Sequence, residues 1–180
     1  MGPPRAAARD EGFRAFVVAR RPNLVRTATL LTAGDRHLAE DLVQVSLTRL
    51  YVAWPRIRAT EGPDAYAYRI LVNAFTDETR RPWWRRERAH AELPDTTAAE
   101  TLTAEDRDAV RSALAALPPR MRAAVVLRHW LEYDVAETAT ALGCSQGTVK
   151  SQTARGLDRL RELLGPIAEP ADPHDARRVS

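Results

Sequence analysis

Residues 134–160 read DVAETATALGCSQGTVKSQTARGLDRL, and their residue types predict two helices joined by a short turn. Asp134 can cap a first helix that ends at Leu142, because its carboxylate can accept a hydrogen bond from a free backbone N–H of the first turn. Gly143 follows where a short turn needs a positive φ. Ser145 can cap a second helix that runs to about the end of the stretch. Two helices joined in this way predict a helix-turn-helix, whose second helix enters the major groove of DNA.

The side chains on these two helices fit that motif. Ala139 is small where crossing helices must approach closely, and Leu142 and Val149 can fill the angle between them. The exposed face of the second helix is predicted to carry donors for base edges and phosphates, namely Gln146, Thr148, Lys150, Ser151 and Arg155. The alternative is an ordinary helical hairpin with a solvated polar face. The coincidence of turn glycine, small alanine, spaced apolar residues and basic face favours DNA binding.

The composition indicates a small helical protein that acts in the cytoplasm. The chain has 180 residues, of which 44% are hydrophobic and only 6% aromatic, and its formal net charge is +3. The single cysteine, Cys144, excludes a disulfide within the chain, and the scattered histidines form no zinc-binding spacing. No apolar leader or membrane-length stretch is present. We therefore expect neither a metal, nor a cofactor, nor membrane insertion.

The apolar periodicity divides the chain and predicts an all-α fold of two small helical domains joined by a flexible linker. The expected parts are a first domain at 11–85, a linker at 86–103, a helix-turn-helix domain at 104–164 and a disordered tail at 165–180. Each domain is expected to hold about four helices.

The first domain contains one long amphipathic helix. Its predicted core face carries Ala39, Val43, Leu47, Leu50 and Trp54. Gly34-Asp35 predicts a turn before this helix, and Pro55 is expected to end it. Asp64 is the expected cap of the helix that follows.

The second domain resembles a known family. LPPRMRAAVVLRHWLEY at 117–133 and GTVKSQTARGLDRLR at 147–161 are similar to the −35-reading domain of extracytoplasmic-function (ECF, group IV) sigma factors of RNA polymerase. The resemblance covers residues 13–164 and is nearest to the actinobacterial SigE-like branch, through YVAWPRI, RILVN, WWRRER and TVKSQTARGL. It implies DNA contacts in the −35 element for Lys150, Ser151 and Arg155, which add to the predicted donors Gln146 and Thr148, and a phosphate contact for Arg128. Thr138 and Gln152 depart from the pattern, which usually has a large apolar residue and an Arg there.

The first domain carries the AEDLVQ pattern of the sigma helix that docks on the clamp of core RNA polymerase, at residues 39–44. The resemblance implies polymerase contacts for Asp41, Leu42, Gln44, Val45, Thr48 and Tyr51. Such a mixed polar and apolar face suits a protein partner. Leu42 or Val45 could instead complete a wide core stripe.

The helix DAYAYRILVNAFTDETRR at 64–81 resembles the sigma helix that opens and reads the −10 element. The implied DNA contacts are Tyr66, Arg69, Asn73, Asp77 and Arg80, with Asn73 and the loop 59–63 holding a flipped base. Tyr66 and Tyr68 could instead pack in the core. Trp83 and Trp84 in RRPWWRRER could bind nucleic acid or pack the end of the domain.

These patterns predict a sigma factor that binds core RNA polymerase and promoter DNA and catalyses nothing. The alternative is another helix-turn-helix regulator, which would need a receiver or ligand domain that the first domain does not resemble. An enzyme is disfavoured, because no phosphate-binding glycine loop, metal cluster or nucleophile elbow is present. The target promoters, the inducing signal and the existence of an anti-sigma partner stay open.

Overall fold

The computed structural model describes residues 5–57, 62–80 and 104–165, and these ranges contain helices but no strand. The helices are α1 (Arg5–Leu31), α2 (Arg36–Ile57), α3 (Pro63–Thr79), α4 (Ala104–Ala115), α5 (Pro119–His129), α6 (Val135–Leu142) and α7 (Gln146–Leu164). The predicted all-α class is therefore confirmed. The described part of the first domain has three helices rather than about four, because α1 is one continuous helix despite Pro22. The predicted linker at 86–103, Trp83 and Trp84, and all but the first residue of the tail lie outside the described residues.

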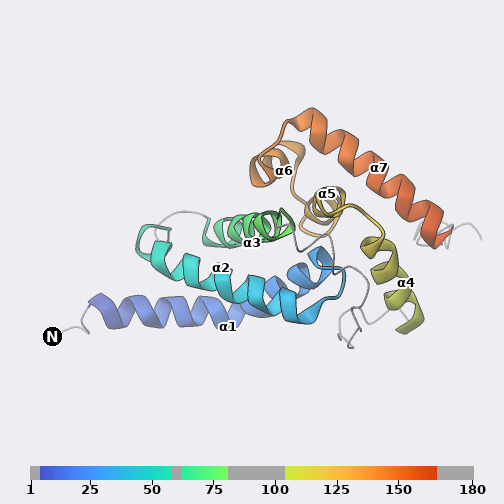
Figure 1. The fold of residues 1–180 in the computed structure, drawn as a ribbon. Helices are drawn as coiled ribbons and strands as arrows, with labels where there is room; N and C mark the ends of the chain where they lie inside the picture. The colour runs from blue at the N-terminus through green and yellow to red at the C-terminus, as the bar shows by residue number, and fades with distance from the viewer. Residues whose placement is uncertain (1–4, 58–61, 81–103, 166–180) are drawn as a thin grey trace, which may run out of the picture.

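In the first domain α2 packs against both α1 and α3 (Figure 1). The predicted core face of α2 is buried throughout, with Leu50 and Val43 fully enclosed. Two predictions about helix ends were wrong. Pro55 does not end α2, which continues to Ile57, because a proline in the last turn removes only one helical hydrogen bond. Asp64 is not the cap of α3: Gly62 holds that position, and Asp64 forms an ion pair with Arg20 of α1 at 2.8 Å.

The helix-turn-helix has the predicted construction. Oδ1 of Asp134 accepts a hydrogen bond from the Glu137 amide at 2.7 Å, and the Glu137 carboxylate accepts one from the Asp134 amide at 2.8 Å. This reciprocal capping box starts α6 at Val135, as expected. Gly143 has φ = 60°, the left-handed conformation that the turn requires. The Thr148 amide donates to Ser145 Oγ at 3.1 Å and so caps α7.

The two domains share a hydrophobic core. Figure 1 shows α5 and α6 between α3 on one side and α7 on the other. Ala123, Val126 and Leu127 of α5 and Ala141 of α6 belong to the same buried cluster as the core of α1–α3. The closeness of the domains was not anticipated from the sequence, because nothing in the local pattern distinguishes an intradomain from an interdomain apolar face.

Candidate nucleic-acid and polymerase interfaces

The face of α7 that points away from the core carries the polar residues expected there. Gln146, Thr148, Lys150, Ser151 and Arg155 are all exposed, whereas Val149 and Gly156 are buried. Neither Lys150 nor Arg155 forms an ion pair with a residue in the described ranges. Further along α7, Arg161 is paired with Asp158 and Arg159 with Glu162, each at 2.8 Å. The cations of α7 that have no carboxylate partner in the described ranges are therefore Lys150 and Arg155, which lie in the first ten residues of the helix.

A second polar stripe runs along α3. Arg69, Asn73, Asp77 and Arg80 are exposed, while Ile70, Leu71, Val72 and Ala74 are buried on the other side of the helix. The stripe contains an amide and two cations together with the carboxylate of Asp77, and the amide and the cations are groups that can bind unstacked bases and their phosphates.

Tyr66 lies half-buried at the start of this stripe. The Arg69 guanidinium carbon lies 4.7 Å from the centroid of the Tyr66 ring, a cation–π contact. Tyr66 and Tyr68 are both partly buried and pack against the core cluster. The alternative prediction, that these two rings pack in the core, is therefore correct in part. Of the loop proposed to approach a base, only Gly62 and Pro63 are described.

The outer face of α2 forms a third surface. Asp41, Gln44, Val45 and Thr48 are exposed, and Val45 keeps 42% of its surface accessible. The neighbouring Arg49 and Val52 are exposed too, Val52 at 77%. Val45 and Val52 lie two turns apart on this face with polar residues around them, and such a mixed surface suits a protein partner.

Comparison with known proteins shows that the segments carrying these three surfaces match known protein families. Residues 16–85 match the family Sigma-70 region 2, and residues 107–160 match Sigma-70, region 4. The RNA polymerase sigma-E factor of Streptomyces avermitilis is 39% identical over 157 residues, which cover 84% of this chain and 84% of that protein. The ECF RNA polymerase sigma factor SigM of Mycobacterium tuberculosis is 37% identical over 139 residues, covering 75% of this chain and 68% of SigM.

The chain is a sigma factor of the extracytoplasmic-function group. As such it directs RNA polymerase to promoters. A solved structure of the sigma factor RpoE from Bartonella quintana, in complex with the anti-sigma factor NepR, has the same fold, with a TM-score of 0.69 and 25% identity. The match covers 86% of the present chain and 97% of the RpoE chain.

Leu42 and Tyr51 of this sigma factor, both predicted to contact polymerase, are less exposed than the other predicted contact residues. Leu42 is only 4% exposed and belongs to the core cluster, so the expectation that it faces a partner was wrong. The reason is that α2 is covered on two sides, which widens its buried stripe beyond the positions read from the periodicity. Tyr51 is half-buried and tied to α1, since its hydroxyl accepts from Arg9 at 2.5 Å and donates to Asp10 at 2.8 Å. Arg49 and Val52 are exposed on the same face but were not among the predicted contact residues, although Val52 lies two turns from Val45.

Gly156 positions the recognition helix of the sigma factor and was also missed. A Cβ at this position would lie 2.5 Å from Cγ2 of Val125 and 3.1 Å from Cγ of Met121, both on α5. A close approach of two helices therefore occurs at Gly156, whereas the approach predicted at Ala139, which is buried, stays a prediction. A glycine within a strong helical pattern was the available signal, because it costs about 1 kcal/mol relative to alanine unless packing requires it.

Arg128 and Thr138 have structural partners in this sigma factor. Arg128 is half-buried and donates from Nη1 to the Tyr133 carbonyl, which fastens the connector between α5 and α6. Thr138 is fully buried where the family usually has a large apolar residue, and its hydroxyl donates to the Asp134 carbonyl at 2.7 Å. Its polar group is therefore satisfied within α6.

Two features are absent from the residues that the structure describes. None of the helices there is long and apolar enough to cross a membrane. No group of histidine, cysteine and acidic side chains there could hold a metal ion.

Proposed function

We propose that this sigma factor reads two promoter elements with separate helices, α7 at the −35 element and the exposed stripe of α3 at the −10 element. The observation that carries the proposal is the division of charge along α7. Its first ten residues offer Lys150 and Arg155 without carboxylate partners in the described chain, and the N-terminal part of a recognition helix is the part that contacts base edges. Gln146 and Thr148, in the first turn of α7, supply neutral hydrogen-bond donors for base edges.

At the −10 element, the exposed amide of Asn73 accepts and donates hydrogen bonds to the edge of an unstacked base. Arg80 holds a phosphate, and the stacked pair of Arg69 and Tyr66 provides a planar surface beside it. Arg128 keeps its proposed phosphate contact through the guanidinium N–H groups that do not bind the Tyr133 carbonyl.

The clamp of core RNA polymerase binds the outer face of α2. The proposed contacts are Asp41, Gln44, Val45 and Thr48, with the exposed part of Tyr51, and Arg49 and Val52 extend the patch. The exposed valines supply apolar area, while the polar residues around them set orientation.

The remaining expectations concern location and partners. We infer that the factor acts in the cytoplasm, where its polymerase works, and that bond formation belongs to the polymerase rather than to this chain. The sigma factor RpoE was solved in complex with an anti-sigma factor. A protein of that class is the expected inhibitor of this chain.

Run-off transcription with core RNA polymerase tests the function. Core enzyme plus this protein is expected to produce transcripts with a fixed start from promoters selected out of a random library, and core enzyme alone is not. A regulator of another helix-turn-helix class would bind duplex DNA by itself but would not co-purify with core enzyme. That second pattern would refute the sigma assignment of the surfaces.

A further inference from the structure

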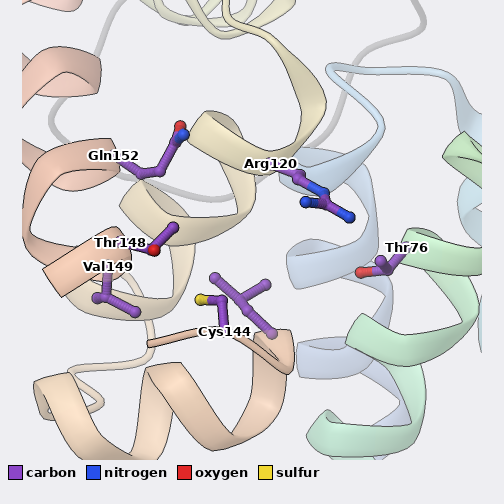
Figure 2. Close-up of a pocket in the computed structure, with 7 residues that line it drawn as sticks. Thr76, Arg120, Cys144, Thr148, Val149 and Gln152 are labelled. Carbon is purple, nitrogen blue, oxygen red and sulfur yellow. The ribbon is translucent and has the colours of Figure 1, made fainter. Parts of the chain in front are cut away.

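The cavity beside the recognition helix is too small to bind a metabolite. Figure 2 shows it between Thr76 of α3 and Thr148 and Gln152 of α7, and its volume is about 50 Å³. Sites for small molecules usually have volumes of about 300 Å³ or more. A feature with more polar contacts lies on an outer surface, where the start of α1 meets the end of α2 (Figure 1).

Tyr51 of α2 is held by three residues from the first turns of α1. Nη2 of Arg9 donates to the Tyr51 hydroxyl at 2.5 Å, and that hydroxyl donates to Oδ1 of Asp10 at 2.8 Å. The Arg9 guanidinium carbon lies 4.6 Å from the centroid of the Tyr51 ring, and the Phe13 ring meets the Tyr51 ring edge-on with centroids 5.0 Å apart. The hydroxyl and the ring of Tyr51 therefore both have a fixed orientation. All three α1 residues precede residue 16, where the match to Sigma-70 region 2 begins, so that match assigns them no role.

Apolar contacts beside this group already join α1 to α2. Trp54, one turn further along α2, is only 5% exposed, and the centroids of the Phe13 and Phe16 rings lie 5.4 Å and 5.2 Å from it. The side chains of Arg9 and Asp10, in contrast, keep 35% and 49% of their surfaces accessible. Exposed ion pairs contribute little to stability. The bonds of Arg9 and Asp10 therefore matter more for the orientation of Tyr51 than for the packing of the two helices.

Tyr51 continues the proposed polymerase-binding face of α2. Gln44, Thr48 and Tyr51 follow one another at intervals of four and three residues, which places them in one row along the helix. Gln44 and Thr48 are exposed, and Tyr51 is half-buried with its hydroxyl bonded to Arg9 and Asp10. The row therefore continues from α2 to the first turns of α1.

We propose that Arg9 and Asp10 are positioning residues for polymerase binding, which hold Tyr51 in the orientation in which its exposed edge meets the clamp. This inference rests on the proposed docking of the clamp on α2. A side chain that is already fixed in the free protein loses less conformational entropy on binding, so the affinity rises without a new contact. The first turns of α1 therefore act on the interface through Tyr51 and not by touching the polymerase themselves.

Equilibrium binding of purified variants to core RNA polymerase tests the proposal. Arg9→Met keeps the length of the side chain but removes its N–H donors, and it is expected to weaken binding about threefold to tenfold, because one more mobile side chain must then be immobilised. Arg9→Lys keeps a cation and a donor for the Tyr51 hydroxyl and should restore most of the affinity. Arg14→Met is the matched control, because Arg14 is an exposed arginine of the same helix without a partner among the described residues. This control should bind as wild type does.

A double-variant cycle separates positioning from direct contact. Tyr51→Leu is expected to weaken binding by itself, and the addition of Arg9→Met should cause no further loss, because Arg9 then has no ring to position. Equal fold losses for Arg9→Met with and without the Tyr51 ring would overturn the proposal, since they would mean that Arg9 acts on the polymerase directly. A wild-type affinity of Arg9→Met would overturn it as well.

Two further measurements separate this role from a structural one and from the proposed function. The unfolding midpoints of Arg9→Met and Arg9→Lys should be close to that of wild type, and a loss of affinity that follows a loss of stability across the variants would overturn the positioning role. If Asp41→Ala with Gln44→Ala binds core polymerase as wild type does, the proposed docking on α2 fails, and the positioning role fails with it. If that double variant binds weakly while Arg9→Met binds as Arg14→Met does, only the positioning role fails.

Discussion

Gly156 of α7 and Val125 of α5 are in such close contact that a Cβ on the glycine would lie 2.5 Å from Cγ2 of the valine. Gly156→Ala is therefore expected to destabilise the protein by about 1–3 kcal/mol, the usual effect of overpacking a core. The better helix propensity of alanine, worth about 1 kcal/mol, offsets only part of this. Urea unfolding measures the difference.

The same helix supplies the control for Gly156→Ala. A Cβ at Gly147 would meet nothing closer than Ser145 Oγ at 3.8 Å, an ordinary contact. Gly147→Ala should therefore leave stability unchanged or raise it. In the double variant Gly156→Ala with Val125→Ala, part of the loss should be recovered. Equal unfolding midpoints for Gly156→Ala and wild type would show that α5 and α7 can shift apart enough to accept the added methyl group without loss of stability.

Polymerase binding should depend on the outer face of α2 and not on its core face. Asp41→Ala with Gln44→Ala is expected to weaken retention on core polymerase while helix content and unfolding midpoint stay at wild-type values, because both residues are exposed. Leu42→Ala should instead lower stability by about 2–5 kcal/mol, since it leaves a cavity in the core. Co-purification with core enzyme, alongside circular dichroism, separates the effects. Wild-type retention of the double variant would remove α2 from the interface.

Promoter binding should depend on the unpaired cations of α7. Lys150→Ala and Arg155→Ala are each expected to cost about 1–3 kcal/mol where a base is read, with relaxed specificity at that base pair, or to weaken all sequences equally where a phosphate is held. Arg161→Ala is the matched control, because that exposed arginine is already paired with Asp158. Titrations at several salt concentrations distinguish the two kinds of contact. If Arg161→Ala had the larger effect, the recognition face would be misplaced.

Strand opening should depend on Asn73. Because the Asn73 amide is exposed on α3 between Arg69 and Asp77, Asn73→Ala is expected to spare polymerase binding and closed-complex formation and to reduce open complexes. The defect should shrink on a template whose −10 region is already mismatched, since the few kcal/mol needed to unstack a base are then supplied in advance. Permanganate footprinting on both templates measures opening. Normal opening of duplex promoters by the variant would make Asn73 a structural residue only.

The alkaline stability of the protein should depend on Tyr133. Burial, with smaller contributions from the charges of Glu137, Tyr68 and Asp64, raises the pKa of Tyr133 from 10.0 to about 12. The folded state therefore favours the neutral phenol, and this stabilisation is complete below pH 10 and is lost as the pH rises from 10 toward 12. Tyr133→Phe should reduce the loss of stability over that range.

At pH 7 the same substitution should be neutral or slightly stabilising, because the buried Tyr133 hydroxyl has no hydrogen-bond partner among the described residues. Thermal unfolding at pH 7, 10 and 11.5 compares the two proteins. If the unfolding temperatures of Tyr133→Phe and wild type fell in parallel as the pH rises, Tyr133 would not be the source of the alkaline loss of stability.

The features that the sequence predicted well are those that neighbouring residues determine. Asp134, Gly143 and Ser145 act on backbone groups within a few positions, so the bounds of α6 and the start of α7 followed directly from residue types. The exposed members of the α7 and α3 surfaces were also predicted, because a helix with one buried face leaves the others to solvent.

The features that the sequence predicted poorly depend on what packs from elsewhere in the chain. Leu42 is buried because a second helix covers it, and Gly156 is required because α5 crosses at that point. The contact of Arg122 with Leu31 joins residues 91 positions apart, and no local periodicity reports such a pair. Resemblance to the family supplied the roles of the surfaces, which periodicity alone could not.

The capping box and the left-handed Gly143 have a consequence for local unfolding. The α6 helix has only eight residues, below the length that is stable in isolation, so satisfied ends alone cannot keep it folded. Its neighbours are α3, α5 and α7, and α3 belongs to the other domain. Loss of that one neighbour is expected to lower the free energy of opening for the amides of α6. The rate of hydrogen exchange at the amides of α6 therefore reports whether α3 of the first domain is in contact with α6.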